Sequence, residues 1–429
     1  MSELAINGGT PVRTKDFPAW PVFDEKESRA VGQVLESGKW WHSGFGEAMC
    51  SGDAGARVSS QVSLFQKEFA RHQGSRYGIA CANGTGALEL LVRALDIGPG
   101  MEVIVPAYTY MAGCSCVLQS NAVPIFVDID PRTYNIDPGK VEQAISSDTA
   151  AVIPCHFGGQ TADMDRLLEL CRKHGLYLIE DAAHAHGSRW DGRGAGTMGI
   201  GGTFSFQNSK NMTAGEGGIV LTDEEKLALR IESLASLGRR HGRPWYEFHE
   251  VGWNYRMTEF QAAILRCQLG RLELQNASRR ENAAILAEGF EAIGGLDPVE
   301  VDPRAEMRSV HIYMLRYSPE NFKGLSRARL IEAVNAEGIP ASAGYAHPLY
   351  RNPVFSGEVF NVHGRPLSFS PYGKNIDYAS FAEQCPVAEI ACAYEAIWLE
   401  HRLLLGDRRD MDDIVNAFAK VRKHCGELV

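Results

Sequence analysis

The chain has 429 residues, which is long enough for more than one hydrophobic core, because single cores stop growing beyond roughly 250 to 300 residues. A composition of 45% hydrophobic and 22% charged residues excludes collagen-like and disordered classes. The 43 basic and 53 acidic residues give a formal net charge of -10, which argues against a nucleic-acid partner or an anionic membrane surface. We therefore expect a folded, soluble protein of two domains.

The ten cysteines are scattered along the chain, with no CxxC pair and no metal-finger spacing. They are typical of buried free thiols in a reducing compartment. The first residues, MSELAINGGTPVRTKDFP, lack the basic segment and apolar run of a signal peptide, and no run of about 18 apolar residues occurs elsewhere. These features predict a cytoplasmic protein with no membrane partner.

From about residue 60, short apolar runs alternate with amphipathic segments. Helices are predicted at SLFQKEFARHQ (63–73), ALELLVRALDI (87–97), MAGCSCVLQSN (111–121), KVEQAIS (140–146) and MDRLLELCRKHG (164–175). Strands are predicted at YGIACA (77–82), EVIVPAYT (102–109), VPIFVDI (123–129), AAVIPCHF (150–157), LYLIEDAAH (176–184), TFSFQ (203–207) and GGIVLTD (217–223). A long helical stretch (257–293) follows and leads to a second, smaller lobe from about residue 290.

The predicted strands are apolar throughout rather than alternating, so we expect helices on both faces of the sheet. This pattern predicts an α/β fold with a mainly parallel, doubly wound sheet. Ligands of such sheets bind at the carboxyl ends of the strands. The residues that fall near those ends are Asn83, Tyr110, Asp181, His184 and Lys210.

Lys210 lies between an apolar strand and a glycine-rich turn, in FSFQNSKNMTAGEGG (204–218). In a crevice, burial lowers the pKa of a lysine, so that a neutral amine becomes available as a nucleophile or base. The glycines that follow permit a tight turn or close approach of a ligand. A lysine on an exposed turn is the alternative that the spacing leaves open.

Asp181 ends the apolar strand LYLIED, where a carboxylate is costly to bury without a partner. A protonated pyridine nitrogen would be such a partner, because the pair keeps the carboxylate ionised and the ring electron-poor. The alternative is an aspartate that caps a helix or pairs with an arginine such as Arg189.

NGTGALELL, from Asn83, has the pattern of a strand, a tight turn and a helix. Gly84 and Thr85 offer N–H groups and a hydroxyl at a helix N-terminus, where the helix dipole favours a phosphate. The Walker lysine and the GxGxxG pattern are both missing, so a single phosphate fits better than a nucleoside triphosphate or a dinucleotide. The glycine-rich stretch GRGAGTMGIGG (192–202) is interpreted as a loop.

His184 and His186 are two residues apart in an extended segment, but no carboxylate or cysteine set completes a metal shell, so we predict no metal. Tyr110 alone indicates only an aromatic in the core or against a ligand. Taken together, a lysine, a strand-end aspartate, a helix start suited to phosphate and an aromatic are what a pyridoxal phosphate site requires.

Nine motifs then run along nearly the whole chain: LAINGGTPV, NGTGALEL, EVIVPAYTY, VPIFVDIDPRTYNIDP, CHFGGQTADMD, IEDAAHAHGS, FSFQNSKNMTAGEGG, GWNYRMTEFQAAIL and HPLYRNPVF. In this order they resemble the DegT/DnrJ/StrS family of pyridoxal phosphate aminotransferases, which act on sugars and cyclitols. SGKWWHSG and AIWLEHRLLLGDRRDMDDIVNAF are similar to the branch with glutamine:scyllo-inosose aminotransferases and 3-amino-5-hydroxybenzoate synthase. The resemblance implies the fold type I (aspartate aminotransferase-like) architecture, with a mainly parallel seven-stranded sheet in a large domain and a smaller C-terminal α/β domain.

Carried over by position, the resemblance implies that pyridoxal 5'-phosphate is bound covalently to Lys210 and that Asp181 pairs with its pyridine nitrogen. His184 matches a position near the phenolic oxygen of the cofactor, and Tyr110 matches an aromatic that stacks on the ring. The positions that match phosphate-binding residues are Gly84, Thr85 and Ser205.

Asn254, in GWNYRMTE, matches an asparagine that reaches the cofactor phosphate of the neighbouring subunit, which implies a homodimer with shared active sites. The expected parts of the chain are an N-terminal arm (1–25), a large cofactor-binding domain (26–265), a linking helix (266–290) and a small C-terminal domain (291–429). EAMCSGDAGARVSSQ (47–61) is either an active-site flap or a surface loop.

The resemblance implies transamination from L-glutamate or L-glutamine to a ketone of a cyclitol or sugar-type acceptor, in secondary-metabolite or aminosugar biosynthesis. The alternatives are a 3-amino-5-hydroxybenzoate synthase-like aromatising enzyme and a nucleotide-sugar aminotransferase. A non-enzymatic binding protein of this fold would not need Lys210, Asp181 and His184 together. A basic cluster either meets an anionic group of the substrate or forms a solvated loop; it comprises Arg239, Arg240, His241 and Arg243.

Overall fold

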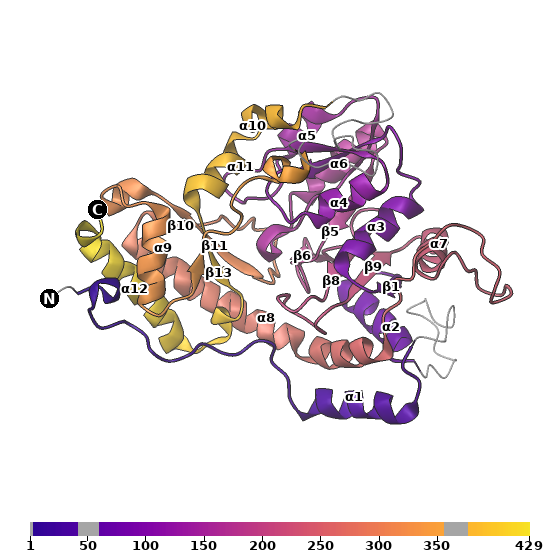
Figure 1. The fold of residues 1–429 in the computed structure, drawn as a ribbon, viewed down its shortest axis with the longest axis horizontal. Helices are drawn as coiled ribbons and strands as arrows, with labels where there is room; N and C mark the ends of the chain where they lie inside the picture. Colours follow the sequence, from indigo (N-terminus) through magenta and orange to yellow (C-terminus); the bar gives the residue numbers. More distant parts are fainter. Residues whose placement is uncertain (1–2, 42–59, 356–375) are drawn as a thin grey trace.

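Two main β-sheets and a long helix that runs along both of them organise the molecule (Figure 1). The computed structural model describes residues 3–41, 60–355 and 376–429. The segment 47–61, predicted as a flap or a loop, lies outside the described residues apart from its last two positions.

The larger sheet has seven strands in the order β1-β9-β8-β5-β4-β2-β3. Only β9 runs antiparallel to its neighbours, and every other adjacent pair is parallel. The strands are β1 (Tyr77–Cys81), β2 (Glu102–Pro106), β3 (Val123–Val127), β4 (Thr149–Val152), β5 (Tyr177–Asp181), β8 (Gly201–Ser205) and β9 (Gly218–Thr222). The predicted mainly parallel, seven-stranded sheet is therefore confirmed.

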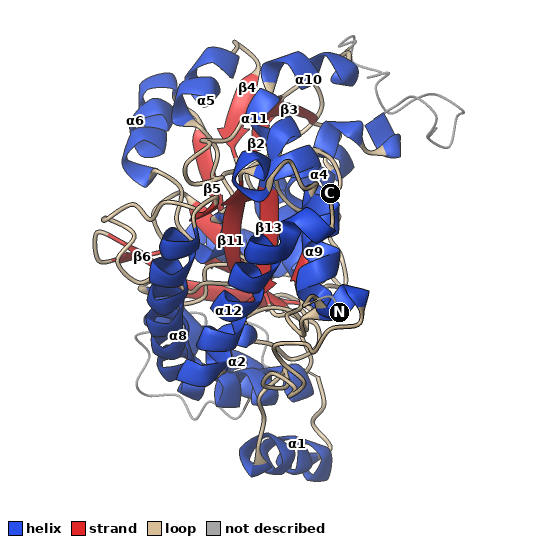
Figure 2. Cartoon of the chain, turned by 90° about the vertical axis from the view of Figure 1, so that its left-hand side faces the viewer, coloured by secondary structure: helices blue, strands red, loops and turns tan. Residues whose placement is uncertain are grey.

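Helices cover both faces of this sheet, as the uniformly apolar strands predicted (Figure 2). On β2, Val103 and Val105 pack with α3, α4 and α7, whereas Ile104, between them, packs with α5 and α6 on the other face. Both halves of the strand's two-residue period are therefore buried. The helices are α2 (Gln61–Gln73), α3 (Gly84–Ala94), α4 (Ala112–Gln119), α5 (Pro138–Ala144), α6 (Met164–His174) and α7 (Glu225–Ala235).

The smaller sheet is antiparallel throughout, in the order β10-β11-β13-β12. Its strands are β10 (Leu296–Pro298), β11 (Ile312–Tyr317), β12 (Ala341–Ser342) and β13 (Ala396–Glu400). The helices α9 (Arg327–Ala336) and α12 (Arg408–His424) pack on it, and Leu4 and Phe17 from the N-terminal residues join the same core. The short helices α10 (Phe381–Gln384) and α11 (Pro386–Ile390) lie instead with the core of the larger sheet.

Helix α8 (Glu259–Ile293) spans both sheets. It begins at a capping box of Thr258 and Gln261, contacts α2 and α1 (Glu25–Ser37) with one part, and contacts α12 and β10 with another. Since α8 runs without a break through residues 265 and 290, the domain boundaries placed there stay a prediction. Neither α8 nor any other helix of the described residues is long and apolar enough to cross a membrane. The cytoplasmic location stays a prediction as well.

Candidate active site

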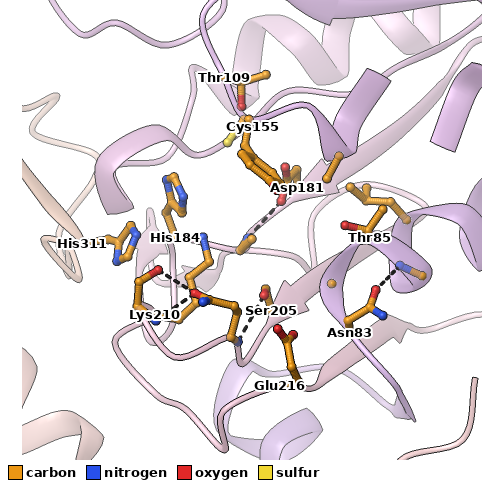
Figure 3. Close-up of a pocket in the computed structure, with 18 of the residues that line it drawn as sticks. Asn83, Thr85, Thr109, Cys155, Asp181, His184, Ser205, Lys210, Glu216 and His311 are labelled. Carbon is orange, nitrogen blue, oxygen red and sulfur yellow. Dashed lines mark hydrogen bonds between the residues drawn. The ribbon is translucent and has the colours of Figure 1, made fainter. Parts of the chain in front are cut away.

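A cavity of about 780 Å³ opens where the parallel strands of the larger sheet end (Figure 3). Eight residues predicted from the sequence line it: Asn83, Gly84, Thr85, Tyr110, Asp181, His184, Ser205 and Lys210. They come from segments more than 100 residues apart, and the sheet brings them together. Asn254, also predicted, is not part of this wall.

Lys210 lies on the loop after β8, where its backbone N–H donates to the Gln207 carbonyl at 2.9 Å. Its side chain lines the cavity rather than extending into solvent, so the exposed-turn alternative is wrong. Burial lowers the pKa of the amine, and the nearby carboxylate of Asp181 partly opposes that shift. A neutral amine is therefore available at a lower pH than for a lysine in water.

Asp181 ends β5 and is only 5% exposed. Burial raises the pKa of its carboxyl, although a hydrogen bond from the Ala183 N–H at 3.1 Å and the Lys210 amine act in the opposite direction. Arg189 does not pair with it, because that guanidinium donates to the carbonyls of Gly192 and His72. Asp181 therefore faces the cavity without an arginine partner, and a cation bound there would hold it ionised.

His184 lines the cavity, and its buried Nδ1 has no hydrogen-bond partner among the described residues. Burial and the Lys210 charge hold its pKa well below the usual value, so the ring is neutral. His186 instead reaches the Ser205 carbonyl through Nε2 at 2.9 Å and packs between Phe69 and Phe204. The two histidines thus do not share a site, and no cluster in the described ranges has three potential metal ligands.

The N-terminus of α3 borders the cavity opposite His184. Asn83 caps the helix by accepting a hydrogen bond from the Gly86 N–H at 2.8 Å, which leaves the first-turn N–H groups of Gly84 and Thr85 facing the cavity. A Cβ on Gly84 would lie 2.6 Å from the Cβ of Ser205, so only glycine allows this close approach of α3 to β8. N–H groups, a helix dipole and the Ser205 hydroxyl together form a cradle for an anion.

The glycine-rich stretch 192–202 has a structural role beside the site. The carboxylate of Glu180 is fully buried and accepts from the N–H groups of Gly196, Met198 and Gly199 at 2.6–2.7 Å and from His156 Nε2 at 2.9 Å. This loop therefore wraps a carboxylate next to Asp181, on the other face of β5. The whole stretch was predicted to be a loop, but Arg193–Gly194 forms β7, which pairs with β6 (Arg189–Trp190), and the last two residues belong to β8.

Tyr110 and Asn254 lie toward the outside of the molecule. Tyr110 is 60% exposed at the edge of the cavity. Asn254 is exposed, and its backbone pairs with Ser236 rather than with a strand of the cavity wall. Close to Ser236, the predicted basic cluster surrounds a separate hollow of about 160 Å³, lined by Arg239, Arg240, His241, Gly242, Arg243, Pro244 and Trp245.

Part of the cavity wall was not predicted. His311, Tyr345 and Trp398 come from the smaller sheet and the loops at its ends, and Cys155 and Tyr255 come from the larger sheet's side. Cys155, Tyr255 and Trp398 fall within quoted motifs, but nothing in those motifs distinguishes a residue of the cavity wall from a core residue, and aromatic residues in apolar runs usually belong to a core. Only the pairing of the distant strands of the smaller sheet places them here.

Comparisons with known proteins agree with this geometry. The DegT/DnrJ/EryC1/StrS aminotransferase family matches residues 24–368. The chain belongs to this family. An L-glutamine:2-deoxy-scyllo-inosose aminotransferase from Streptoalloteichus tenebrarius is 39% identical over 435 residues, which cover 99% of each chain. The 3-amino-5-hydroxybenzoate synthase of Amycolatopsis mediterranei is 36% identical over 408 residues, covering 93% of this chain and 95% of the relative.

Among solved structures, the crystal structure of a 3-amino-5-hydroxybenzoic acid synthase superposes with a TM-score of 0.82 at 34% identity, covering 95% of this chain and 98% of that one. The family and the fold predicted from the motifs are thereby confirmed. As a member of the family, the protein is a pyridoxal phosphate-dependent aminotransferase.

The residues of this aminotransferase fit pyridoxal phosphate. The anion cradle at Gly84 and Thr85 suits the phosphate, and Asp181 is a buried carboxylate that forms no ion pair with the described residues. The unpartnered Nδ1 of His184 offers a hydrogen bond to a polar group in the cavity. Each of these features would be costly in an empty core, and each is met by a different part of the same cofactor.

Proposed function

We propose that the protein transfers the amino group of L-glutamine to the ketone of a cyclitol related to scyllo-inosose, in aminocyclitol biosynthesis. The observation that carries the proposal is the meeting of Lys210, Asp181 and the α3 cradle in one cavity. Relatives named L-glutamine:2-deoxy-scyllo-inosose aminotransferase, from Streptomyces lividus and Streptomyces paromomycinus among others, match this chain over 98–99% of its length and support the choice of donor and acceptor.

In this proposal the amine of Lys210 would hold the cofactor covalently, and Gly84, Thr85 and Ser205 would hold its phosphate. Asp181 would pair with the ring nitrogen, and Tyr110 would cover the ring. When bound, pyridoxal phosphate supplies an electron-poor ring that stabilises negative charge on the reacting carbon.

Lys210 also acts as the proton carrier of the reaction. With the amino donor bound, the free Lys210 amine removes the proton from Cα of the donor. This general-base role requires a neutral amine. Its lowered pKa supplies this form. In the second half of the reaction the same amine returns a proton to the acceptor's carbon, by the reverse step.

Replacement of Lys210 by alanine tests the assignment. We expect Lys210→Ala to lose the absorbance of the covalently bound cofactor and to lose transamination from L-glutamine, because both the attachment point and the base are gone. Spectra of the reconstituted protein and single-turnover assays with L-glutamine measure the two effects. A variant that turns over at the wild-type rate would refute the assignment.

A second candidate is an enzyme that also aromatises its product, as the likeness to 3-amino-5-hydroxybenzoate synthase suggests. The two proposals differ in the product, because transamination leaves a saturated ring and aromatisation removes water as well. Mass spectrometry and ultraviolet absorbance of the product of each ketone separate them.

The proposal includes a homodimer in which Asn254 of one subunit reaches the cofactor phosphate of the other. Asn254 is exposed and is not one of the residues that line its own cavity, which supports that role. We expect Asn254→Ala to remain a dimer by light scattering but to release pyridoxal phosphate more readily on dialysis. A wild-type protein that is a fully active monomer would contradict the shared site.

A further inference from the structure

The cavity wall opposite the α3 cradle is built by the smaller sheet. His311 immediately precedes β11, Tyr345 follows β12, and Trp398 lies within β13. The cradle and Asp181 accommodate the cofactor, so this second wall is left for the substrates. Its polar groups therefore bear on which acceptor the enzyme takes.

The ring of Tyr345 is held in one position. Gly344 has a φ of +70°, and a Cβ there would collide with the Trp398 indole, so the loop lies directly on that ring. The Tyr345 ring centroid is 4.9 Å from that of Trp398, 5.4 Å from Tyr108 and 6.0 Å from Phe157. Trp398 is itself fixed by a hydrogen bond of 3.0 Å from its Nε1 to the Tyr108 hydroxyl.

The Tyr345 hydroxyl is free to bind a ligand. It makes no hydrogen bond to any residue in the described ranges, and the residue lines the cavity. Burial raises its pKa well above the usual value, with Cys155 and Asp181 acting in the same direction, so it keeps its proton. The Tyr345 hydroxyl is therefore a fixed hydrogen-bond donor with no acceptor among the described residues.

His311 offers the complementary group. Asn211 donates through Nδ2 to the Ser309 carbonyl at 2.7 Å, which directs its Oδ1 toward His311 Nδ1 at 2.8 Å and makes that nitrogen the donor. Burial holds the pKa of His311 well below its usual value, so the ring is neutral and Nε2 carries a lone pair. The rings of His184 and His401 lie 4.2 Å and 5.5 Å from the His311 ring, His311 lines the cavity, and its Nε2 makes no hydrogen bond to any described residue.

The charges of the wall restrict its ligand further. Of the residues that line the cavity in the described ranges, Lys210 is the only lysine or arginine, whereas Glu89, Asp181 and Glu216 are acidic. The side formed by His311, Ile312, Tyr345 and Trp398 holds no charged group. A phosphate-bearing sugar would find no cation on this side, whereas a neutral ring with hydroxyl groups would find one donor and one acceptor.

We propose that Tyr345 and His311 select an uncharged, polyhydroxylated ketone as the acceptor, with the Tyr345 hydroxyl donating to one ring oxygen and His311 Nε2 accepting from a ring hydroxyl. This inference rests on the proposed function and assigns its specificity to two residues of the smaller sheet. A site built to bind hydroxyl groups discriminates against rings that lack them, since its own polar groups are then left unpaired.

The test compares variants that each remove one polar atom. Tyr345→Phe keeps the ring and its aromatic contacts. His311→Asn keeps a donor for Asn211 and loses the acceptor at the Nε2 position, while His311→Gln returns a polar group there. We expect the first two to lower kcat/KM for 2-deoxy-scyllo-inosose about tenfold, the loss typical of one hydrogen bond, with partial recovery in His311→Gln.

Three readouts separate this role from a structural one. The rate of the half-reaction with L-glutamine should stay within about twofold of wild type. A cyclohexanone without hydroxyls should be a poor acceptor for wild type, and Tyr345→Phe should use it no less efficiently than wild type does. Tyr313→Phe is the matched control, because its buried hydroxyl also has no hydrogen-bond partner among the described residues but lies in the core of the smaller sheet. This control should leave both rates unchanged.

The same experiments distinguish failure of the assignment of Tyr345 and His311 from failure of the proposed function. The inference is overturned if wild type and Tyr345→Phe use the keto-cyclitol equally well. It is also overturned if Tyr345→Phe loses as much of the L-glutamine half-reaction as of its activity toward the keto-cyclitol. If wild type instead prefers a nucleotide-linked keto-sugar, the proposed acceptor is wrong and the inference with it. If wild type does not react with L-glutamine at all, the proposed function fails at its first half.

Discussion

Burial acts in opposite senses on Lys210 and Asp181, two of the charged residues that line the cavity. It lowers the pKa of Lys210 and raises that of Asp181, so both are driven toward their neutral forms, and each partly offsets the shift of the other. A cation paired with Asp181 would keep the carboxylate ionised. The charge state of this single residue therefore decides how strongly the ring of a bound cofactor withdraws electrons.

Asp181→Asn separates catalysis from stability at this position. We expect transamination to fall by a factor of about 10² to 10³, the range for the loss of one preorganised electrostatic partner, while the cofactor still attaches to Lys210. The cofactor-free variant should unfold at the same or a higher temperature, because a neutral amide costs less to bury than a carboxylate. Kinetics and thermal melts of the same preparation check both halves, and a variant with wild-type kcat would contradict the role of the charge.

The contact between α3 and β8 sets the shape of the anion cradle. Gly84→Ala should push the helix away from Ser205, since the added Cβ would lie 2.6 Å from the serine Cβ. Overpacking of this kind costs about 1–3 kcal/mol of stability, and we expect weaker retention of pyridoxal phosphate as well. Urea unfolding and a fluorescence titration with the cofactor measure the two effects.

Gly32→Ala, within α1, is the matched control for that experiment. Apart from its chain neighbours and the backbone of its own helix, no heavy atom of the described residues lies within 4 Å of the added Cβ. The change should therefore raise stability by about 0.5–1 kcal/mol through helix propensity and leave cofactor binding unchanged. Equal losses in the two alanine variants would show that the α3 contact has no special role.

The cavity wall formed by the larger sheet and α3 could be predicted from the sequence, whereas the wall formed by the smaller sheet could not. Asp181 and Gly84 each stand at a strand end or a helix start, and the carboxyl ends of parallel strands meet at one edge of a sheet. Tyr345, by contrast, is placed by the pairing of β12 with β13, more than 50 residues apart in the chain, and by its contact with Trp398. Local periodicity carries no information on such a long-range pairing.

Across the whole molecule, buried histidines link stability to pH. The pKa values of His184, His311 and His401 are held well below the usual value, and that of His186 is lowered to about 3, in each case mainly by burial. Below pH 6.5 the unfolded chain binds protons at these four sites that the folded chain does not bind. Stability therefore rises with pH in this range and falls as the pH drops below 6.5.

Between pH 7.0 and pH 5.5 we expect the cofactor-free protein to lose about 1 kcal/mol of unfolding free energy for each of these histidines. Urea titrations at the two pH values measure the loss. His401→Gln, which removes one titrating group, should lose correspondingly less. A free energy of unfolding that is the same at both values would show that the histidines are not held neutral in the folded state.

Helix α8 fixes the position of the smaller sheet relative to the larger one. The helix is about 52 Å long at 1.5 Å per residue, and it contacts α1 and α2 with one part and α12 and β10, which belong to the smaller lobe, with another. One residue inserted within it would turn everything that follows by about 100° and carry Tyr345 and Trp398 away from Lys210. A crossover between the genes of two relatives, placed after Gly294, would leave α8 intact. It would exchange the whole acceptor-facing wall, including Tyr345 and Trp398, in one step. New acceptor preferences could therefore arise by crossover at a single point, without any change to the residues that hold the cofactor.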